Sequence, residues 1–299
     1  HATTGVYEHF FEPLLEAKFG DRKDDVSAAW LLGRIRFRGE RDLRRGEILG
    51  YFDGSFGVLL DALVESVGRE RIETNARVVE VEFAPRGEER VESVTVETES
   101  GTETHDTDAV VVATMPNVLE DLTGYECEID FQGAVCALVT MDRQLMDTYW
   151  LNVAEETPFG ALIEHTNFVP PERYGGEHLL YVASYVQSRD DWRWRASDAE
   201  LEECWLDGIS NLFPSFSRDH VESVRVSRNP RAAPVYERGY LETVIPYDLS
   251  EELGEGVYYA GMASRAQYPE RSLDGGVVAG FECADRIAAD ASRAPTRSE

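Results

Sequence analysis

The residues best suited to chemistry lie near the end of the chain, where an apolar run at 256–261 leads into a glycine-rich stretch. The run predicts a buried strand, and Gly261 at its end lets a ligand approach the backbone because glycine carries no side chain. A helix is expected to begin near Asp274, and the backbone N–H groups of its first turn suit a pyrophosphate or an electron-rich ring edge. An ordinary glycine-rich helix packed on a strand would show the same pattern. The small residues that narrow one face of this helix are Gly275, Gly276, Ala279 and Gly280.

A second group with chemical potential is a cluster of six arginines within twelve positions: Arg34, Arg36, Arg38, Arg41, Arg44 and Arg45. Guanidinium groups bind carboxylates and phosphates in a two-pronged geometry, so the cluster predicts a site for an anionic group of a substrate or cofactor. Arg36 and Arg38 are the candidate substrate residues. The alternative is a salt-bridged face that answers nearby carboxylates, and the acidic surroundings favour it.

The charge of the chain limits its partners. Acidic residues number 57 against 29 basic ones, which gives a net charge of −28, and only Lys18 and Lys23 are lysines. Such a surface repels nucleic acid and anionic membranes, so neither is an expected partner. The acidity is spread along the whole chain, which is typical of proteins from halophiles that work in molar salt. An acidic interaction face is the alternative interpretation.

The four cysteines, Cys127, Cys136, Cys204 and Cys283, form no CxxC pair and no spacing that predicts a metal site. Free thiols in a reducing cytoplasm are therefore expected. No apolar run reaches the roughly 18 residues of a membrane-spanning helix, and no signal peptide is recognisable. A cytoplasmic protein without stable membrane insertion is the prediction.

The helices and strands that must position these residues are predicted from two parts of the chain with different patterns, residues 1–118 and residues 119–250. The first 118 residues predict two helices, a turn followed by a helix that Gly68 ends, and a hairpin at Pro85-Arg86-Gly87. A continuous apolar run then predicts a strand buried on both faces, stopped by Pro116. The expected helices are 7–15, 26–38 and 58–64, and the expected strands are 71–74, 78–83, 91–98 and 108–113.

Residues 119–250 differ, because alternating strands at 134–140, 178–185 and 221–228 surround an amphipathic helix at 198–212. This pattern predicts a separate lobe with a mixed sheet. The final stretch returns to a buried strand and a small-residue helix over about 274–289, followed by a polar tail at 291–299.

Several of these segments, in this order, resemble the flavin amine oxidases. Residues 51–63 resemble that family's glycine-rich turn and helix, and residues 108–116 resemble its strand and turn ending in Ala-Thr-Met-Pro. The closing stretch resembles the family's C-terminal flavin motif, with Tyr-Ala-Gly at 259–261, Tyr-Pro-Glu-Arg-Ser at 268–272 and Asp-Gly-Gly at 274–276. The resemblance extends to protoporphyrinogen oxidases, phytoene desaturases and UDP-galactopyranose mutases.

The resemblance implies an α/β flavoprotein with FAD as cofactor and a small-molecule substrate. Its glutathione-reductase-like FAD/NAD(P)-binding lobe would lack the N-terminal βαβ unit, and its substrate lobe would be α+β with a mixed sheet. The implied FAD lobe comprises residues 49–118 and 251–290. The implied substrate lobe comprises a helical part at 1–48 and residues 119–250.

The resemblance also assigns cofactor contacts, and this sequence departs from the family in two respects. An acidic residue usually follows the glycine of the closing strand to hold the ribityl chain, whereas here it is Met262. No G-x-G-x-x-G occurs in the chain, although such flavoproteins carry it near their N-terminus. The chain therefore reads as one that lacks its first portion and holds FAD poorly; whether that segment is lost or supplied by another chain stays open, as does the oligomeric state. The backbone of Val78 would contact the adenine. The other implied contacts are Gly261, Met262, Arg271, Ser272, Asp274, Gly275 and Gly276.

A flavin oxidase needs positioning, a dry cavity and aromatic walls rather than a catalytic triad. Tyr236, Tyr240 and Tyr268 are the candidate walls. His165, with Glu164 beside it, is a candidate proton acceptor, although a lone histidine more often has a structural role. A Trp-Arg-Trp-Arg run at 192–195 could form a substrate rim, but a loop packed on the lobe is the favoured interpretation.

The expected activity is FAD-dependent dehydrogenation of an amine, an isoprenoid or a lipid-like molecule by hydride transfer to flavin. One rival is a mutase in which reduced flavin acts on a nucleotide sugar, which the arginine cluster would favour because such a sugar carries two phosphates. The other rival is an inactive fragment or binding partner.

The charge predicts a dependence of stability on salt. In dilute salt, repulsion among the surplus carboxylates is unscreened, because the Debye length grows from about 3 Å at 1 M to about 30 Å at 0.01 M. We expect the melting temperature to be higher in molar salt than in dilute salt. Thermal unfolding followed by circular dichroism checks this expectation, and an unchanged melting temperature would refute it.

Overall fold

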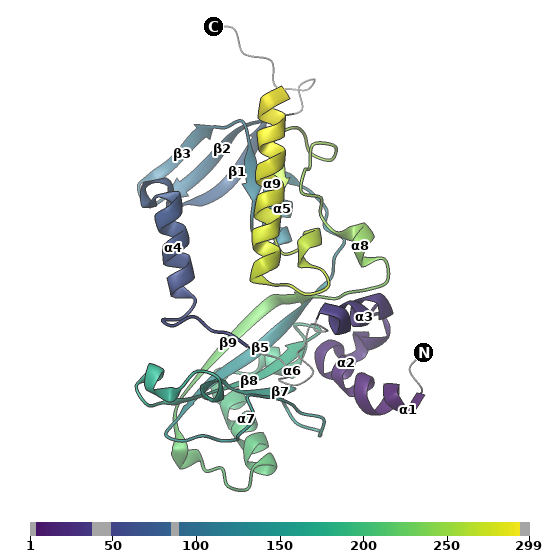
Figure 1. The fold of residues 1–299 in the computed structure, drawn as a ribbon, viewed down its shortest axis with the longest axis vertical. Helices are drawn as coiled ribbons and strands as arrows, with labels where there is room; N and C mark the ends of the chain where they lie inside the picture. Colours follow the sequence, from purple (N-terminus) through teal and green to yellow (C-terminus); the bar gives the residue numbers. More distant parts are fainter. Residues whose placement is uncertain (1–3, 38–48, 85–89, 294–299) are drawn as a thin grey trace. The chain divides into compact units, whose positions relative to one another are not determined.

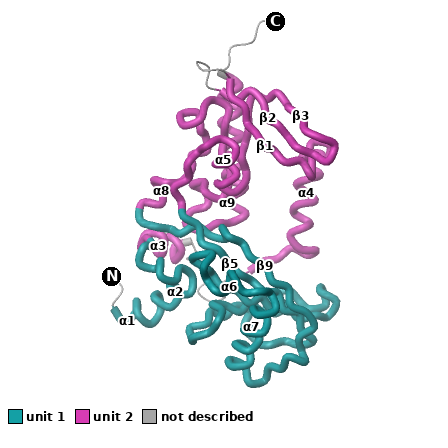
Figure 2. The backbone as a smooth tube through the Cα atoms, turned by 180° about the vertical axis from the view of Figure 1, so that it is seen from behind, with its two compact units in different colours: residues 1–26, 130–238 teal, residues 27–129, 239–299 magenta. Residues whose placement is uncertain are grey.

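The chain crosses three times between two structural units, unit 1 (residues 1–26 and 130–238) and unit 2 (residues 27–129 and 239–299) (Figure 2). The structure, a computed structural model, describes residues 4–37, 49–84 and 90–293 (Figure 1). The units alternate along the chain in the same order as the two expected lobes. Their boundaries lie at 26/27, 129/130 and 238/239, whereas the sequence pattern suggested 48/49, 118/119 and 250/251. The assignment of cofactor and substrate to these lobes stays a prediction.

Unit 1 is built on a five-stranded sheet in the order β6-β7-β8-β5-β9. Each neighbouring pair in this sheet is antiparallel, so the expected mixed sheet is wrong. Strands β6, β7 and β8 follow one another in sequence through loops, and such links join antiparallel neighbours, whereas parallel neighbours need a crossover. The strands are β5 (Phe131–Met141), β6 (Trp150–Asn152), β7 (Ala161–Glu164), β8 (His178–Val186) and β9 (Val221–Pro234).

The core of unit 1 lies between this sheet and helix α7 (Asp198–Leu212), which has the predicted bounds. Ser197 caps the helix by accepting the Glu200 N–H, while the Glu200 carboxylate accepts the Ser197 N–H, a reciprocal capping box. The buried side of α7 is apolar and contains Trp205, which is 1% exposed. Alternate residues of β5 face it, because successive side chains of a strand point to opposite faces: Val135, Ala137, Val139 and Met141.

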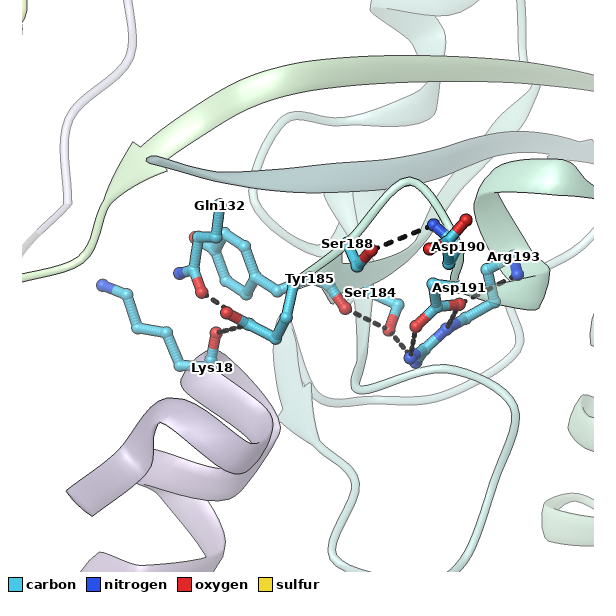
Figure 3. A network of polar contacts seen from close by, with 9 residues as sticks. Lys18, Gln132, Ser184, Tyr185, Ser188, Asp190, Asp191 and Arg193 are labelled. Carbon is cyan, nitrogen blue, oxygen red and sulfur yellow. Dashed lines mark hydrogen bonds and ion pairs between the residues drawn. The ribbon is translucent and has the colours of Figure 1, made fainter. Parts of the chain in front are cut away.

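The Trp-Arg-Trp-Arg run forms helix α6 (Trp192–Arg195) and packs on unit 1. Arg193 donates to both carboxylate oxygens of Asp191 and to the Ser184 hydroxyl at 2.6 Å (Figure 3). Burial opposes ionisation of Asp191, but the hydrogen bonds from Arg193 outweigh it and hold the pKa of Asp191 below its usual value. Trp194 adds to the core next to α7, which supports the packed interpretation over a substrate rim.

Helix α2 (Glu12–Phe19) precedes this sheet in sequence and contacts β8 within unit 1. Phe19 is fully buried, and Gln187 after β8 donates to the Gln132 side chain at 2.7 Å. The helical elements of unit 1 are α1 (Thr4–Val6), the π-helical turn η1 (Tyr7–Phe11), α2 (Glu12–Phe19), η2 (Gly20–Asp24), η4 (His165–Asn167), η5 (Pro171–Tyr174) and η6 (Arg218–His220), besides α6 and α7.

Arg22 joins the three places where the chain leaves or enters unit 1. Its guanidinium donates to Asp25 at 2.8 Å, to Asp130 at 3.2 Å and to Glu237. Each of these carboxylates lies within two residues of a crossing. The hydrogen bond to Asp25 is the main cause that raises the pKa of Arg22, and the bond to Asp130 and the charge of Glu237 add to it. One cation therefore fixes three chain segments that are far apart in sequence.

Unit 2 contains a three-stranded antiparallel sheet, β1-β2-β3, and a two-stranded parallel sheet, β10-β4. The strands are β1 (Arg77–Phe83), β2 (Val91–Thr98), β3 (Gly101–Asp106), β4 (Val110–Val112) and β10 (Val257–Tyr259). The helices are α3 (Ala28–Phe37), α4 (Gly57–Val67), η3 (Arg69–Arg71), α5 (Pro116–Thr123), α8 (Tyr240–Thr243), η7 (Arg265–Gln267) and α9 (Leu273–Arg293).

The predicted hairpin is confirmed by the pairing of β1 with β2, although its turn at 85–87 lies outside the described residues. Gly68 ends α4 as predicted, with a positive φ of 93° and its N–H on the Val64 carbonyl. The strand expected at 71–74 is wrong, because the turn after Gly68 continues as η3. Strand β3 escaped prediction because it is exposed along its whole length and carries no apolar alternation.

Strand β4 confirms the run at 108–113 but not its burial on both faces. Val112 is 5% exposed, whereas Val111 is 40% exposed. Among the described residues β4 pairs with β10 alone, so its other edge and part of its surface stay uncovered. No helix in the described part of the chain is long and apolar enough to span a membrane.

Replacing Arg22 with methionine leaves three carboxylates close together without their shared cation. We expect the Arg22→Met variant to lose about 1–2 kcal/mol of unfolding free energy, because a partly exposed ion pair contributes about 0.2–1 kcal/mol and this residue makes several. Urea unfolding followed by tryptophan fluorescence at fixed molar salt measures the loss. The control is Arg143→Met, which removes an exposed guanidinium beside Asp142, and equal losses in the two variants would contradict the role of Arg22.

Candidate functional site

The turn between β10 and α9, together with the start of α9, holds most of the predicted cofactor residues, and Tyr259 fixes the first half of this turn. The buried Tyr259 hydroxyl donates to the Thr114 carbonyl at 3.1 Å and accepts the Ala263 N–H at 3.2 Å. Burial is the main cause that raises the pKa of Tyr259 well above its usual value, so the hydroxyl stays a donor. The loop after β4 and the loop after β10 are thus tied together.

The structure requires glycine at position 261 for a different reason from the one that the sequence suggested. A Cβ at this position would lie 1.9 Å from the Thr114 carbonyl oxygen and 2.5 Å from the Tyr259 hydroxyl. The absent side chain therefore makes room for the protein's own backbone. Contact of FAD with the remaining sides of Gly261 stays a prediction, as does contact with the half-buried Met262.

Ser272 is the N-cap of α9. Its hydroxyl accepts the Gly275 N–H at 3.0 Å, which satisfies one of the helix's first amides. Gln267, which is buried, accepts the Ser272 N–H at 2.9 Å, and a Cβ on Gly275 would lie 2.6 Å from the Ala266 carbonyl oxygen. Residues of the same chain thus fix the start of α9. If Ser272 also contacts the cofactor, as predicted, it must do so while its hydroxyl caps the helix.

The small residues of α9 do not share one environment. Gly275 and Ala279 face the interior of unit 2, and Ala279 is fully buried. Gly276 meets its first neighbour at 4.0 Å from a built Cβ, and Gly280 meets none within 4 Å. The expected narrow face is therefore two faces, one packed and one open, and Asp274 is exposed at the helix start.

Val78 lies on β1, an edge strand of its sheet, next to a register shift in the pairing with β2. An edge strand has backbone groups on one side that are not used in its own ladder, so they are available to a ligand. This placement fits a backbone contact with adenine, as the resemblance implied.

A polar cluster joins α3 to the segment before α9. The Trp30 indole N–H donates to the Pro269 carbonyl at 2.8 Å, and Arg34 forms an ion pair with Glu270. A Cβ on Gly33 would lie 3.1 Å from Pro269, so glycine lets the helix approach. The ion pair agrees with the salt-bridged interpretation for Arg34, while Arg36 is exposed. The rest of the arginine cluster lies outside the described residues: Arg38, Arg41, Arg44 and Arg45.

The structure brings together two of the three candidate wall tyrosines. The rings of Tyr240 and Tyr268 stack with centroids 5.7 Å apart and planes inclined by 26°. Tyr240 is buried and Tyr268 half-buried, and burial raises the pKa of Tyr268. Arg271, half-buried, follows three residues after Tyr268 in the same turn.

Tyr236 and His165 belong to unit 1 and lie apart within it. The Lys18 ammonium lies 5.9 Å from the ring of the buried Tyr236 and 6.0 Å from the ring of Tyr185. His165 contacts Tyr181, which lies on β8 four residues before Tyr185. Four residues of a strand span about 13 Å, so these two candidates do not form one site.

His165 and Glu164 also have separate environments, although they are adjacent in sequence. The His165 Nε2 atom and the Tyr174 hydroxyl are 2.6 Å apart, and burial lowers the pKa of His165. Glu164 is fully buried and accepts the Leu145 N–H at 3.2 Å and the Thr166 hydroxyl at 3.4 Å. Burial raises the pKa of Glu164 to about 7. Its contacts hold the loop after β5, which is a structural role.

Sequence reasoning missed several residues that organise the site: Trp30, Tyr259, Gln267 and Glu270. Trp30, Tyr259 and Glu270 act through partners far away in sequence, and Gln267 acts through a loop contact with Ser272, so no local pattern reveals these roles. Ser272 was among the predicted residues, and serine before a helix is a common N-cap.

A family model described as flavin containing amine oxidoreductase matches residues 3–288. The chain belongs to this family. The cofactor of this family is FAD. A search of curated protein sequences gave no significant match.

The fold of this family member is similar to that of solved flavoproteins. A protein from Exiguobacterium sp. 255-15, assigned as a protoporphyrinogen oxidase, matches with a TM-score of 0.68 and 15% identity over 95% of this chain and 64% of its own. Reduced UDP-galactopyranose mutase matches with a TM-score of 0.69 and 15% identity over 96% of this chain and 66% of its own. Putrescine oxidase bound to putrescine matches with a TM-score of 0.53 and 14% identity over 79% and 53%. The 299 residues thus span less than two thirds of the length of these solved relatives.

The buried carboxyl group of Glu164 predicts a pH dependence of stability. Its pKa of about 7 lies above the value of about 4.3 for a glutamate in an unfolded chain, so folding favours the protonated form. This contribution to stability is fully present below about pH 4 and is lost as the pH rises through about 7. We expect Glu164→Gln to remove about 1–3 kcal/mol of that decline.

Chemical denaturation at a series of pH values measures this decline in the wild type and the variant. The matched control is Glu177→Gln, which changes an exposed carboxylate. The same slope in wild type and Glu164→Gln would show that Glu164 is ionised in the folded state across the whole range.

Proposed function

We propose that this protein takes part in FAD-dependent dehydrogenation of an amine, an isoprenoid or a lipid-like substrate. The observation that carries the proposal is the turn from β10 to α9, where the family match coincides with a helix start held open by Gly276. FAD, when bound, supplies the acceptor for a hydride from the substrate. The chain's own residues then have to bind the cofactor, orient the substrate and exclude water.

The fit of the turn to a cofactor rests on two features of the described residues. The Ser264 hydroxyl is fully buried and has no hydrogen-bond partner among them, a state that costs about 1–3 kcal/mol unless another group pairs with it. The first turn of α9 offers backbone N–H groups and an open side at Gly276. In the proposal Gly261, Met262, Arg271 and Asp274–Gly276 surround the flavin end, and the β1 edge at Val78 meets the adenine.

For the substrate, the proposal uses the stacked pair of Tyr240 and Tyr268 as an aromatic wall. Two stacked rings form a rigid apolar surface that suits an amine's carbon chain or an isoprenoid. Tyr236 is fully buried beside Lys18, so its assigned role is support of unit 1. His165 is engaged with Tyr174, which favours a structural role there over proton transfer.

The mutase alternative remains distinct because it needs reduced flavin and an anionic sugar nucleotide. Arg34 forms an ion pair with Glu270. Among the described residues of the arginine cluster, the exposed Arg36 is therefore the candidate for binding the phosphates of a sugar nucleotide. Bleaching of the flavin by an amine or apolar substrate without oxygen would favour dehydrogenation. Turnover of a UDP-sugar that appears only with pre-reduced flavin would favour the mutase.

The cofactor proposal predicts that a side chain at Gly276 blocks flavin binding. A leucine there meets open space in the chain and suits a helix, so the fold should persist, but the residue would occupy the side from which FAD approaches. We expect Gly276→Leu to weaken FAD binding at least about tenfold, equivalent to about 1.4 kcal/mol. Quenching of flavin fluorescence in molar salt measures the affinity, and the visible spectrum after desalting shows whether flavin is retained.

The control is Ala288→Leu, which places the same side chain on an exposed position of α9 away from the helix start. Equal affinities of the two variants would remove Gly276 from the site. If wild type binds no FAD, the same titration is made with a version lengthened by the coding sequence that flanks it. If neither version binds FAD, the flavoprotein proposal is rejected, and the alternative of an inactive fragment or binding partner is supported.

A further inference from the structure

A buried amide in unit 1 has one end that its own chain leaves unpaired. Gln132, near the start of β5, is 1% exposed, and its Oε1 atom accepts a hydrogen bond from the Gln187 side chain at 2.7 Å. Its Nε2 atom has no hydrogen-bond partner among the described residues. A buried donor without an acceptor is destabilising, and native structures ordinarily supply one. Gln132 therefore marks a place where an acceptor from outside the described chain would be stabilising.

The orientation of this amide follows from its neighbour. The oxygen and nitrogen of an amide side chain are told apart by the hydrogen bonds that they make. The Gln187 atom that contacts Gln132 also lies 3.5 Å from the Lys18 carbonyl oxygen, which can only accept. This atom is therefore the donating nitrogen, and the Gln132 atom that faces it must be the oxygen. The nitrogen of Gln132 is thus the end that points away from Gln187.

The ammonium group of Lys18 lies in the same part of unit 1. Lys18 belongs to α2, which packs on β8, and its Nζ atom lies 6.0 Å from the ring of Tyr185 and 5.9 Å from the ring of Tyr236. Tyr185 pairs with Ala134, two residues after Gln132 on β5. Alternate residues of a strand share a face of the sheet, so the amide of Gln132 and the ring of Tyr185 lie on the same face. Figure 3 shows Lys18, Gln132 and Tyr185 at this end of the sheet.

The chemistry of these two groups selects the class of ligand. The ammonium of Lys18 and the amide nitrogen of Gln132 are both donors, so the ligand has to offer acceptor oxygens and a negative charge. A carboxylate has two oxygens, one for each donor. A phosphate dianion would keep one charge without a cation at this pair, because Gln132 is neutral. The half-buried ring of Tyr185 offers an apolar surface to the hydrocarbon part of the ligand.

We propose that Lys18 and Gln132 form a binding site for the carboxylate group of a small molecule. One carboxylate oxygen accepts from the ammonium of Lys18, and the other accepts from the Gln132 amide. The hydrocarbon part of the molecule lies against the ring of Tyr185. This inference goes beyond the proposed function, because the site is built from residues of unit 1 and needs no flavin to bind its ligand.

Titration of the 299-residue chain with hexanoate, followed by calorimetry, tests the proposal. Hexanamide is the uncharged control of the same size. The titrations are made in molar salt, where a Debye length of about 3 Å removes the repulsion from distant carboxylates but screens a half-buried pair less. We expect hexanoate to bind at least about tenfold more tightly than hexanamide. Equal affinities for the two compounds would overturn the proposal.

The two lysines of the chain provide a matched pair of variants. Lys18→Met keeps an unbranched apolar stem against the aromatic rings and should reduce the affinity for hexanoate to that for hexanamide. Lys23→Met changes the net charge by the same amount, but Lys23 is paired with Glu12 at 2.8 Å, so this variant should bind as the wild type does. Circular dichroism confirms that each variant is folded. An equal loss of affinity in both variants would reduce the result to a general effect of charge and overturn the site.

A double-mutant cycle tests the geometry whatever the natural ligand is. Gln132→Glu keeps the oxygen that faces Gln187 and places a second oxygen where the amide nitrogen was. With Lys18 present, this carboxylate should pair with the ammonium and block hexanoate. In the Lys18→Met background it is buried without a cation, so the same substitution should lower the melting temperature more than it does in the wild type. Equal shifts in the two backgrounds would show that the two groups do not face one site.

Two further outcomes separate this site from other interpretations. Inorganic phosphate that binds more tightly than hexanoate, with the same dependence on Lys18, would overturn the assignment to a carboxylate. No flavin is present in these titrations. Binding of hexanoate together with failure to bind FAD would therefore retain the site and reject only the proposed function, whereas binding of FAD without hexanoate would reject the site alone.

Discussion

The ion pairs of Arg22 are the constraint on which the organisation of unit 1 depends. The unit is discontinuous in sequence, since residues 1–26 must find residues 130–238 after more than a hundred intervening residues. The hydrophobic core between the sheet and α7 comes from the second segment, and the first segment joins it through the contact of α2 with β8 and the buried Phe19. Arg22 supplies a directional link, because its planar guanidinium meets Asp25, Asp130 and Glu237 at once. In a chain with so many carboxylates, a single cation that serves three of them defines where the segments meet.

Local signals were sufficient for the elements whose stability is local. The bounds of α7 follow from its capping box and its apolar periodicity, and the strands β5 and β8 follow from alternation. Strand β3 could not be predicted, because its stability comes from pairing with β2 and not from burial of its own side chains. The mixed sheet was predicted wrongly for unit 1, because strands β6 and β7, whose loop connections favour antiparallel neighbours, were not recognised in the sequence.

The candidate site divides in the same way. The motif located the turn from β10 to α9 and the start of the helix, because glycines and a buried strand leave a recognisable pattern. It did not reveal how the turn is held. Tyr259 reaches Thr114 across 145 positions of sequence, and Trp30 reaches Pro269 across 239. Such contacts depend on the tertiary fold, so the identity of the supporting residues emerges only from the structure.

The crowding at Gly261 affects how genetic data on this family member should be interpreted. Any larger residue there would push the loop after β4 away from the loop after β10, because the space is taken by a carbonyl oxygen and a buried hydroxyl. A mutagenesis screen would therefore score position 261 as intolerant even in a protein that never met a ligand. Intolerance at Gly280, where the chain itself leaves room, would instead be a signature of something that binds from outside. The two glycines would thus test different constraints, the fold of the chain at Gly261 and contact with an external group at Gly280.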